Sequence, residues 1–202
     1  MRPMRRRVSP ALLLVIALAA IGLVASLGPR ERTLGVNVRI VYLHGAWVWT
    51  ALLGFGLAAV LGVLGLFGKR PRWQRLSLAW GRAATIFWVT YLPLSLWAMQ
   101  ANWNGLFLEE PRWRLGVDFA IIALLLQGSM ILMGSLGLSA ALNAGFFGCL
   151  LFALNGAEQV LHPPSPIASS GSLAIQAFFT LLVLLCLLAE WQLARWFDGR
   201  AA

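Results

Sequence analysis

Residues 119–157 read FAIIALLLQGSMILMGSLGLSAALNAGFFGCLLFALNGA and contain no charged side chain. A helix that crosses the apolar core of a bilayer needs about 20 predominantly apolar residues. The 39 residues of this run are too many for one crossing and enough for two. The stretch GSLGLS at residues 134–139 permits a tight turn, so we expect the two helices to be divided there.

Four further apolar runs lie outside this stretch. The six predicted spans are residues 10–28, 39–67, 79–101, 116–135, 138–157 and 173–193. The composition agrees, because 60% of the residues are hydrophobic and 11% are charged, whereas soluble domains carry about 25% charged residues. This excludes a soluble enzyme, a disordered chain and a disulfide scaffold. We therefore expect an all-α, polytopic membrane protein whose residues 1–202 form a single transmembrane domain of six helices.

The first span has an alternative interpretation. Residues 1–7 carry four arginines ahead of an apolar run, and Ala25-Ser26 offers small residues, as in a secretory signal peptide. The apolar region of a signal peptide typically runs about 7–15 residues. The uncharged stretch from Val8 to Pro29 is longer, which favours a retained helix.

Basic residues predict the orientation of the spans. With six spans, one side of the membrane holds 11 of the 16 basic residues: ten in the N-terminus, the loop after the second span and the C-terminus, and Arg82 just inside the third span. Loops that carry excess lysine and arginine are usually cytoplasmic. Both termini are therefore expected in the cytoplasm, with residues 29–38, 102–115 and 158–172 outside. The net charge of +9 is explained by this topology and gives no indication of a nucleic-acid partner.

The chain has two histidines, and this topology brings both to the outer face. His44 lies near the outer end of the second span, and His162 lies just beyond the outer end of the fifth. Neutral imidazole is a common axial ligand of haem iron, although a histidine at an interface is often a simple amphipathic anchor. Zinc would need a third or fourth ligand, and Cys149 and Cys186 lie within apolar runs, where packing is their expected role.

The longest polar interruption, residues 100–114, lies between the two histidine segments. Haem is a flat apolar macrocycle with two anionic propionates at one edge. Trp103, Phe107 and Trp113 could cover the ring, and Arg112 and Arg114 could bind the propionates. The alternative is an aromatic belt beside a solvated charged loop.

These segments resemble the haem-handling membrane proteins of cytochrome c maturation, and most closely the six-helix maturation protein C family of cytochrome c assembly proteins. Residues 39–44, RIVYLH, followed by Ala46-Trp47 are similar to the first-histidine segment of that family. Leu161-His162 before a proline-rich loop is similar to its second. Residues 103–112, WNGLFLEEPR, occupy the place of its tryptophan-rich outer loop, with Glu110 where the family has aspartate.

The resemblance implies a haem-binding protein of the bacterial inner membrane with both termini in the cytoplasm. Both histidines would be axial ligands of one haem b, which the tryptophan-rich loop would cover. The expected partners are the lipid bilayer, an extracytoplasmic haem carrier, and the membrane and ATPase subunits of an ABC transporter. The task would be haem delivery rather than catalytic turnover. The residues expected to contact haem are His44, His162, Trp103, Arg112, Glu110, Trp47, Phe107 and Trp113.

Three other functions remain open at this stage. The first is a haem-free permease or transporter subunit, with Pro93 able to kink the third span; the expected spans, however, offer no mid-membrane charge for a transport route. The second is an electron-transfer cytochrome b, which would need four core histidines for two haems. The third is a structural subunit that anchors partners.

Overall fold

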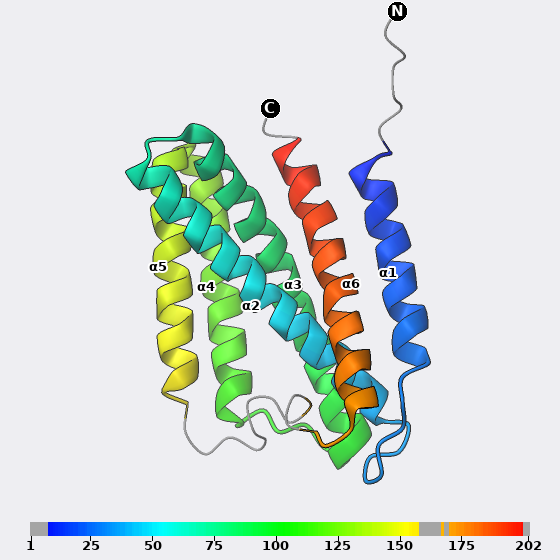
Figure 1. The fold of residues 1–202 in the computed structure, drawn as a ribbon. Helices are drawn as coiled ribbons and strands as arrows, with labels where there is room; N and C mark the ends of the chain where they lie inside the picture. The colour runs from blue at the N-terminus through cyan, green and yellow to red at the C-terminus, as the bar shows by residue number, and fades with distance from the viewer. Residues whose placement is uncertain (1–7, 158–166, 168–169, 200–202) are drawn as a thin grey trace, which may run out of the picture.

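The computed structural model describes residues 8–157, 167 and 170–199, and its regular secondary structure is entirely helical (Figure 1). Six helices follow one another in these residues: α1 (Pro10–Ser26), α2 (Val38–Phe67), α3 (Pro71–Trp103), α4 (Pro111–Met133), α5 (Leu136–Asn155) and α6 (Leu173–Asp198). The predicted all-α class is therefore confirmed.

Four of the helices, α2, α4, α5 and α6, are long and apolar enough to cross a membrane. Helix α1 is apolar but has 17 residues, and α3 has 33 residues that mix arginine, tyrosine and tryptophan with apolar ones. Large apolar side chains point outward, as Leu125 and Leu132 do on α4. An apolar surface of this extent is stable in lipid rather than in water. The protein is thus a helical membrane protein, and six crossings stay a prediction.

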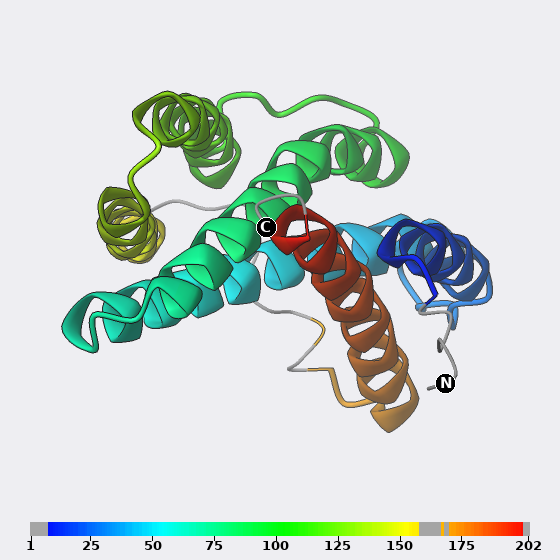
Figure 2. The ribbon, with the colours of Figure 1, turned by 90° about the horizontal axis from the view of Figure 1, so that it is seen from above.

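The α2–α3 hairpin crosses the middle of the bundle. Helices α1 and α6 lie on one side of it, and α4 and α5 lie on the other (Figure 2). In the described residues, neither α1 nor α6 makes a close backbone contact with α4 or α5. The hairpin therefore joins two flanking helix pairs.

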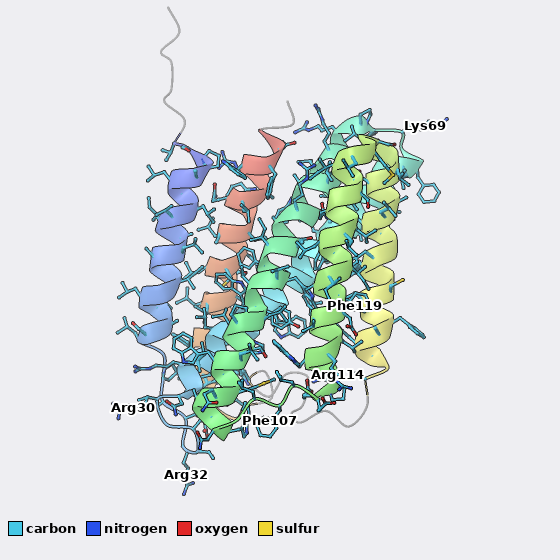
Figure 3. All side chains as sticks on the ribbon, turned by 180° about the vertical axis from the view of Figure 1, so that it is seen from behind. Arg30, Arg32, Lys69, Phe107, Arg114 and Phe119 are labelled. Carbon is cyan, nitrogen blue, oxygen red and sulfur yellow. The ribbon has the colours of Figure 1, made fainter. Side chains whose placement is uncertain are left out.

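The helix ends alternate as the sequence topology requires. The start of α1, the α2–α3 turn and the end of α6 share one end of the bundle (Figure 1). Lys69 marks this end, whereas Arg30, Arg32, Phe107 and Arg114 lie at the opposite end, called here the loop end (Figure 3). Which side of the membrane each end faces stays a prediction.

Helix boundaries follow local backbone chemistry. Helices α3 and α4 begin at Pro71 and Pro111, earlier than the predicted spans, because proline suits the first helical position. Helix α4 ends at Met133, Gly134 adopts a left-handed conformation with φ of +62°, and the Ser135 side chain accepts a hydrogen bond from the Leu138 N–H at the start of α5. The break predicted within residues 134–139 is therefore confirmed.

Three helices share a buried polar contact in the core. The amide nitrogen of Asn143 on α5 donates to the Ser77 carbonyl on α3 at 3.0 Å, and the Ser77 hydroxyl donates to the Ala58 carbonyl on α2 at 2.7 Å. Asn143 is 5% exposed. Hydrogen bonds between membrane helices stabilise association by about 0.6–2 kcal/mol, so this contact fixes α5 against the hairpin.

Replacing Asn143 by alanine is expected to destabilise the bundle by about 1 kcal/mol, because the α5–α3 hydrogen bonds are lost. The measurement is thermal unfolding in detergent. Asn155→Ala is the matched control, since the Asn155 amide bonds the Leu151 carbonyl of its own helix and its loss should shift stability by a few tenths of a kcal/mol. Equal shifts in the two variants would contradict a role for Asn143 between helices.

Candidate functional site

His44 lies in the second turn of α2, at the loop end of the bundle. Its ring is partly buried and faces Tyr91 of α3, with the ring centroids 5.8 Å apart and the planes inclined by 52°. Tyr91 is 5% exposed. The imidazole is therefore held between two helices, and it is not one of the side chains exposed on the outside of the bundle.

Tyr91 and Trp88 join α3 to the first turns of α4. The Trp88 indole N–H donates to the Gly116 carbonyl at 3.1 Å, and the Trp88 and Tyr91 rings meet edge to face at 4.8 Å. The Tyr91 hydroxyl approaches Gly116 so closely that a Cβ on residue 116 would overlap it. Glycine at 116 thus allows α4 to begin against the face of α3 that holds His44.

Glu110 caps the start of α4. Its Oε2 accepts a hydrogen bond from the Trp113 N–H at 2.6 Å, which is the expected role of a carboxylate at a helix N-terminus. Glu110 is 7% exposed, and its Oε1 is buried with no hydrogen-bond partner among the described residues. Glu110 lies close enough to Tyr91 for the two side chains to interact electrostatically. The structure therefore brings His44, Tyr91 and Glu110 into one cluster, with an oxygen able to accept a ligand hydrogen bond.

The two arginines in the first turn of α4, Arg112 and Arg114, differ in burial. Arg112 and Trp113 lie in the first turn of α4 and are partly buried. Arg114 is exposed and forms an ion pair with exposed Glu109. Exposed ion pairs contribute little to stability, so Arg114 belongs to the surface, and Arg112 is the guanidinium nearer the interior of the segment.

Three aromatic residues that the sequence predicts to contact haem, Trp47, Trp103 and Phe107, fall into two groups. Trp103, the last residue of α3, and Phe107 in the loop 104–110 are 49% and 40% exposed. Trp47 is instead engaged with α3: its indole N–H donates to the Thr90 hydroxyl at 2.9 Å, and its ring stacks on Phe87 at 4.6 Å. Trp47 therefore attaches α2, the helix that carries His44, to α3. The side chains of Trp103 and Phe107 are instead partly exposed to the surroundings.

His162 and the proline-rich stretch beside it lie outside the described residues. Ile167, five residues later in the sequence, is described and is 9% exposed. Its Cδ1 lies 3.7 Å from the position of a Cβ built on Gly45, the neighbour of His44. Ile167 thus packs against α2 beside Gly45, the residue that follows His44.

The loop between α1 and α2 is fixed at the same end. The Asn37 amide donates to the Ala101 carbonyl of α3 at 2.8 Å, and the Arg39 guanidinium donates to the Gly28 carbonyl at 2.9 Å. Backbone N–H groups of Leu34 and Thr33 bond the Glu31 carboxylate and lower its pKa. The loop contacts that depend on this carboxylate are therefore present above its ordinary pKa and are lost only as the pH falls through the lowered one.

Two residues of interest were missed by the sequence interpretation. Tyr91 lies in a span rich in tryptophan and tyrosine, and nothing in that pattern distinguishes it from an interfacial aromatic. Glu190 is different, because a carboxylate that follows a long apolar run within helix α6 is a recognisable signal. The structure buries Glu190 completely, so the bundle does contain an interior acidic group.

Comparisons of the chain with protein-family models, with curated proteins and with solved structures give no match.

Proposed function

We propose that the protein binds haem at the loop end of the bundle and delivers it to a carrier outside the membrane. The observation that supports this most is the meeting of three sequence segments there. His44, the start of α4, and Ile167, which follows His162 by five residues in the sequence, all lie at this end. Five residues of extended chain reach about 17 Å, which is enough for the two histidines to approach one haem.

The described side chains offer the chemistry that haem as a cargo requires. The His44 imidazole is a suitable axial ligand, and the exposed faces of Trp103 and Phe107 suit an apolar macrocycle. Arg112, partly buried at the start of α4, suits a propionate. The buried Oε1 of Glu110 can accept a hydrogen bond from a protonated group or from water at the edge of the ligand.

The position of the site suits transfer. Ligands near helix ends shield the iron from water on one side and leave it accessible to a partner on the other. Under this proposal the loop end faces the outside of a bacterial inner membrane, both termini are cytoplasmic, and an ABC transporter and an extracytoplasmic haem carrier are the partners. The reaction is delivery of haem without chemical turnover.

The absorption spectrum of the purified protein tests the proposal. A Soret band with the visible bands of a low-spin, bis-histidine haem b is expected after expression with haem available, or after addition of haem to the detergent-solubilised protein. A protein that purifies without haem and shows no saturable spectral change on haem addition would contradict the proposed function.

Arg112→Ala is expected to weaken haem retention by about tenfold, as follows from losing one charge-assisted hydrogen bond. Complete loss is not expected, because a propionate can still bind water. The measurement is haem dissociation to an excess of an apoprotein acceptor. Arg114→Ala is the control, since Arg114 is exposed and already paired with Glu109, and its effect should be less than twofold. Equal effects would place the propionates away from Arg112.

A haem-free transporter subunit is the second candidate. Glu190, an acidic side chain buried within the bundle, favours it, because interior carboxylates often mark ion or proton routes. Haem binding by the purified protein separates the two candidates.

A further inference from the structure

Glu190 on α6 is an acidic side chain that the protein encloses completely. Its exposed fraction is 0%, and neither carboxyl oxygen has a hydrogen-bond partner among the described residues. Glu110, the other buried acidic residue of the described chain, keeps one hydrogen bond and is 7% exposed. Glu190 therefore lacks the compensation that buried carboxylates usually have.

The carboxyl group of Glu190 fits into the space that Gly54 of α2 leaves. A Cβ built on Gly54 would lie 2.6 Å from the Glu190 Cδ and 2.8 Å from Oε2, closer than a Cβ atom approaches a neighbouring atom in proteins. One helical turn earlier, Thr50 on α2 and Cys186 on α6 are both at 0% exposure and lie beside each other. Thr50, Gly54, Cys186 and Glu190 thus lie together where α2 packs on α6, a group called here the α2–α6 contact.

This contact is enclosed where α2 packs on α6. Gly54 is near the middle of α2, and Glu190 lies eight residues, about 12 Å, before the end of α6. The carboxyl group is screened from water because its side chain is fully buried. An unpaired carboxylate ion at such a position costs several kcal/mol.

No described charge compensates Glu190. Helix α1, which packs on α6, has no ionisable side chain between Pro10 and Ser26. Helix α2 faces Glu190 with Thr50 and Gly54. Helix α3 offers Arg82, but its guanidinium lies over the Phe197 ring at 5.9 Å, two turns of α6 beyond Glu190. On α6 itself Cys186 is the titratable neighbour, and Arg195 lies over Trp191 and bonds Gln192.

We infer that Glu190 is a proton-binding site inside the membrane bundle. A metal cation in an oxygen site needs several oxygen ligands and room for its own volume, and the carboxyl group is already in contact with Gly54. Among the described residues, no three acidic, histidine or cysteine side chains gather to hold a metal ion. A proton requires no space, and it removes the charge. Glu190 keeps the proton while α2 and α6 are packed at Gly54 and exchanges it when this contact opens to water.

Infrared spectroscopy of the full-length protein in lipid vesicles tests the inference. At neutral pH we expect the carbonyl stretch of a protonated carboxylic acid, shifted when the glutamates carry carbon-13 at the carboxyl group and absent in Glu190→Gln. Glu110→Gln should keep the band. If Glu190→Gln does not fold, the inference is tested by two results: the band should shift with carbon-13 labelling, and it should remain in Glu110→Gln. Absence of the band in the wild-type protein, or its persistence unchanged in folded Glu190→Gln, would overturn the inference.

The nature of the bound ion is tested in the same vesicles. Replacing choline chloride by sodium chloride at constant pH should leave the band unchanged. Loss of the band in sodium chloride would identify a cation site and overturn proton binding. Because these measurements use protein without haem, a negative result here leaves the proposed haem binding intact, and a protein that fails to bind haem can still show the carboxylic acid.

A pair of substitutions tests the geometry of the α2–α6 contact. Gly54→Ala should destabilise the bundle by about 1–3 kcal/mol, because the added methyl group overlaps the carboxyl group. In a protein that already carries Glu190→Ala the same change should cost much less, since the overlapping atoms are gone. Equal costs in the two backgrounds would show that the carboxyl group does not lie against Gly54, and the inferred site would be withdrawn.

Discussion

A variant that carries both His44→Ala and His162→Ala is expected to purify without haem. The chain contains two histidines, so this variant has no imidazole left to bind the iron. Each single variant should retain some haem, because one axial ligand and the contacts to the ring remain. Haem content per polypeptide, measured from the Soret absorbance and a pyridine haemochrome assay, gives the result directly. An unchanged haem content in the double variant would show that neither histidine is an axial ligand.

Loss of haem could also follow from misfolding, so the axial role needs its own control. His44→Gly leaves a space on α2 in which free imidazole can bind. Addition of imidazole should restore the low-spin spectrum of this variant. Recovery of that spectrum identifies His44 as an axial ligand, whereas loss of haem that imidazole cannot reverse, in a folded protein, would limit His44 to a packing role beside Tyr91.

Gly116→Ala is expected to cause the largest loss of stability among the substitutions near the site, about 1–3 kcal/mol. The new methyl group would overlap the Tyr91 hydroxyl, and the start of α4 would have to move away from α3. Because Glu110 and Arg112 lie on that segment, haem retention should fall as well. Thermal unfolding in detergent and haem content are the two measurements.

Two further variants make this prediction specific. Tyr91→Phe removes the oxygen that overlaps most, while the ring Cζ stays 2.8 Å from the new Cβ, so Gly116→Ala in that background should recover part of the lost stability. Gly128→Ala, on the same helix, meets no atom within 4 Å, and should be neutral or stabilising by up to about 1 kcal/mol from helix propensity. A similar loss in Gly116→Ala and Gly128→Ala would indicate a general cost of alanine in α4 and would contradict the close approach of Tyr91.

The end of a helix could be predicted from the sequence where a single residue, such as a glycine or a serine, determines it. The uncharged run 119–157 and its glycine and serine residues placed the break between α4 and α5, and Gly134 and Ser135 occupy it. The start of α3 was placed too late, because arginines at 72 and 75 were assigned to a loop. Pro71 begins a helix that continues past these charges, and arginine side chains at a helix end can reach the membrane surface.

The sequence predicts that His44 and Glu110 lie at the same end of the bundle, but it does not predict their contacts. His44 and Glu110 come from the sequence, as does their place at one end of the bundle. Which side of each helix faces a neighbour was not predictable, since apolar residues surround the membrane helices on every side. Trp47 therefore proved to be engaged with Thr90 and Phe87, and Tyr91 proved to be the neighbour of His44. His162 lies outside the described residues, and its pairing with His44 stays a prediction.

The central position of the α2–α3 hairpin determines how distant parts of the protein can communicate. In the described chain, the α1–α6 pair and the α4–α5 pair have no close backbone contact with each other. Binding of a partner to α1 or α6 from the lipid can therefore change the position of Glu110 only through a movement of the hairpin. Helix α2 carries His44 near one end and Gly54 at its centre. A movement of α6 against Gly54 would therefore displace α2, and with it His44 and the helices on the opposite side.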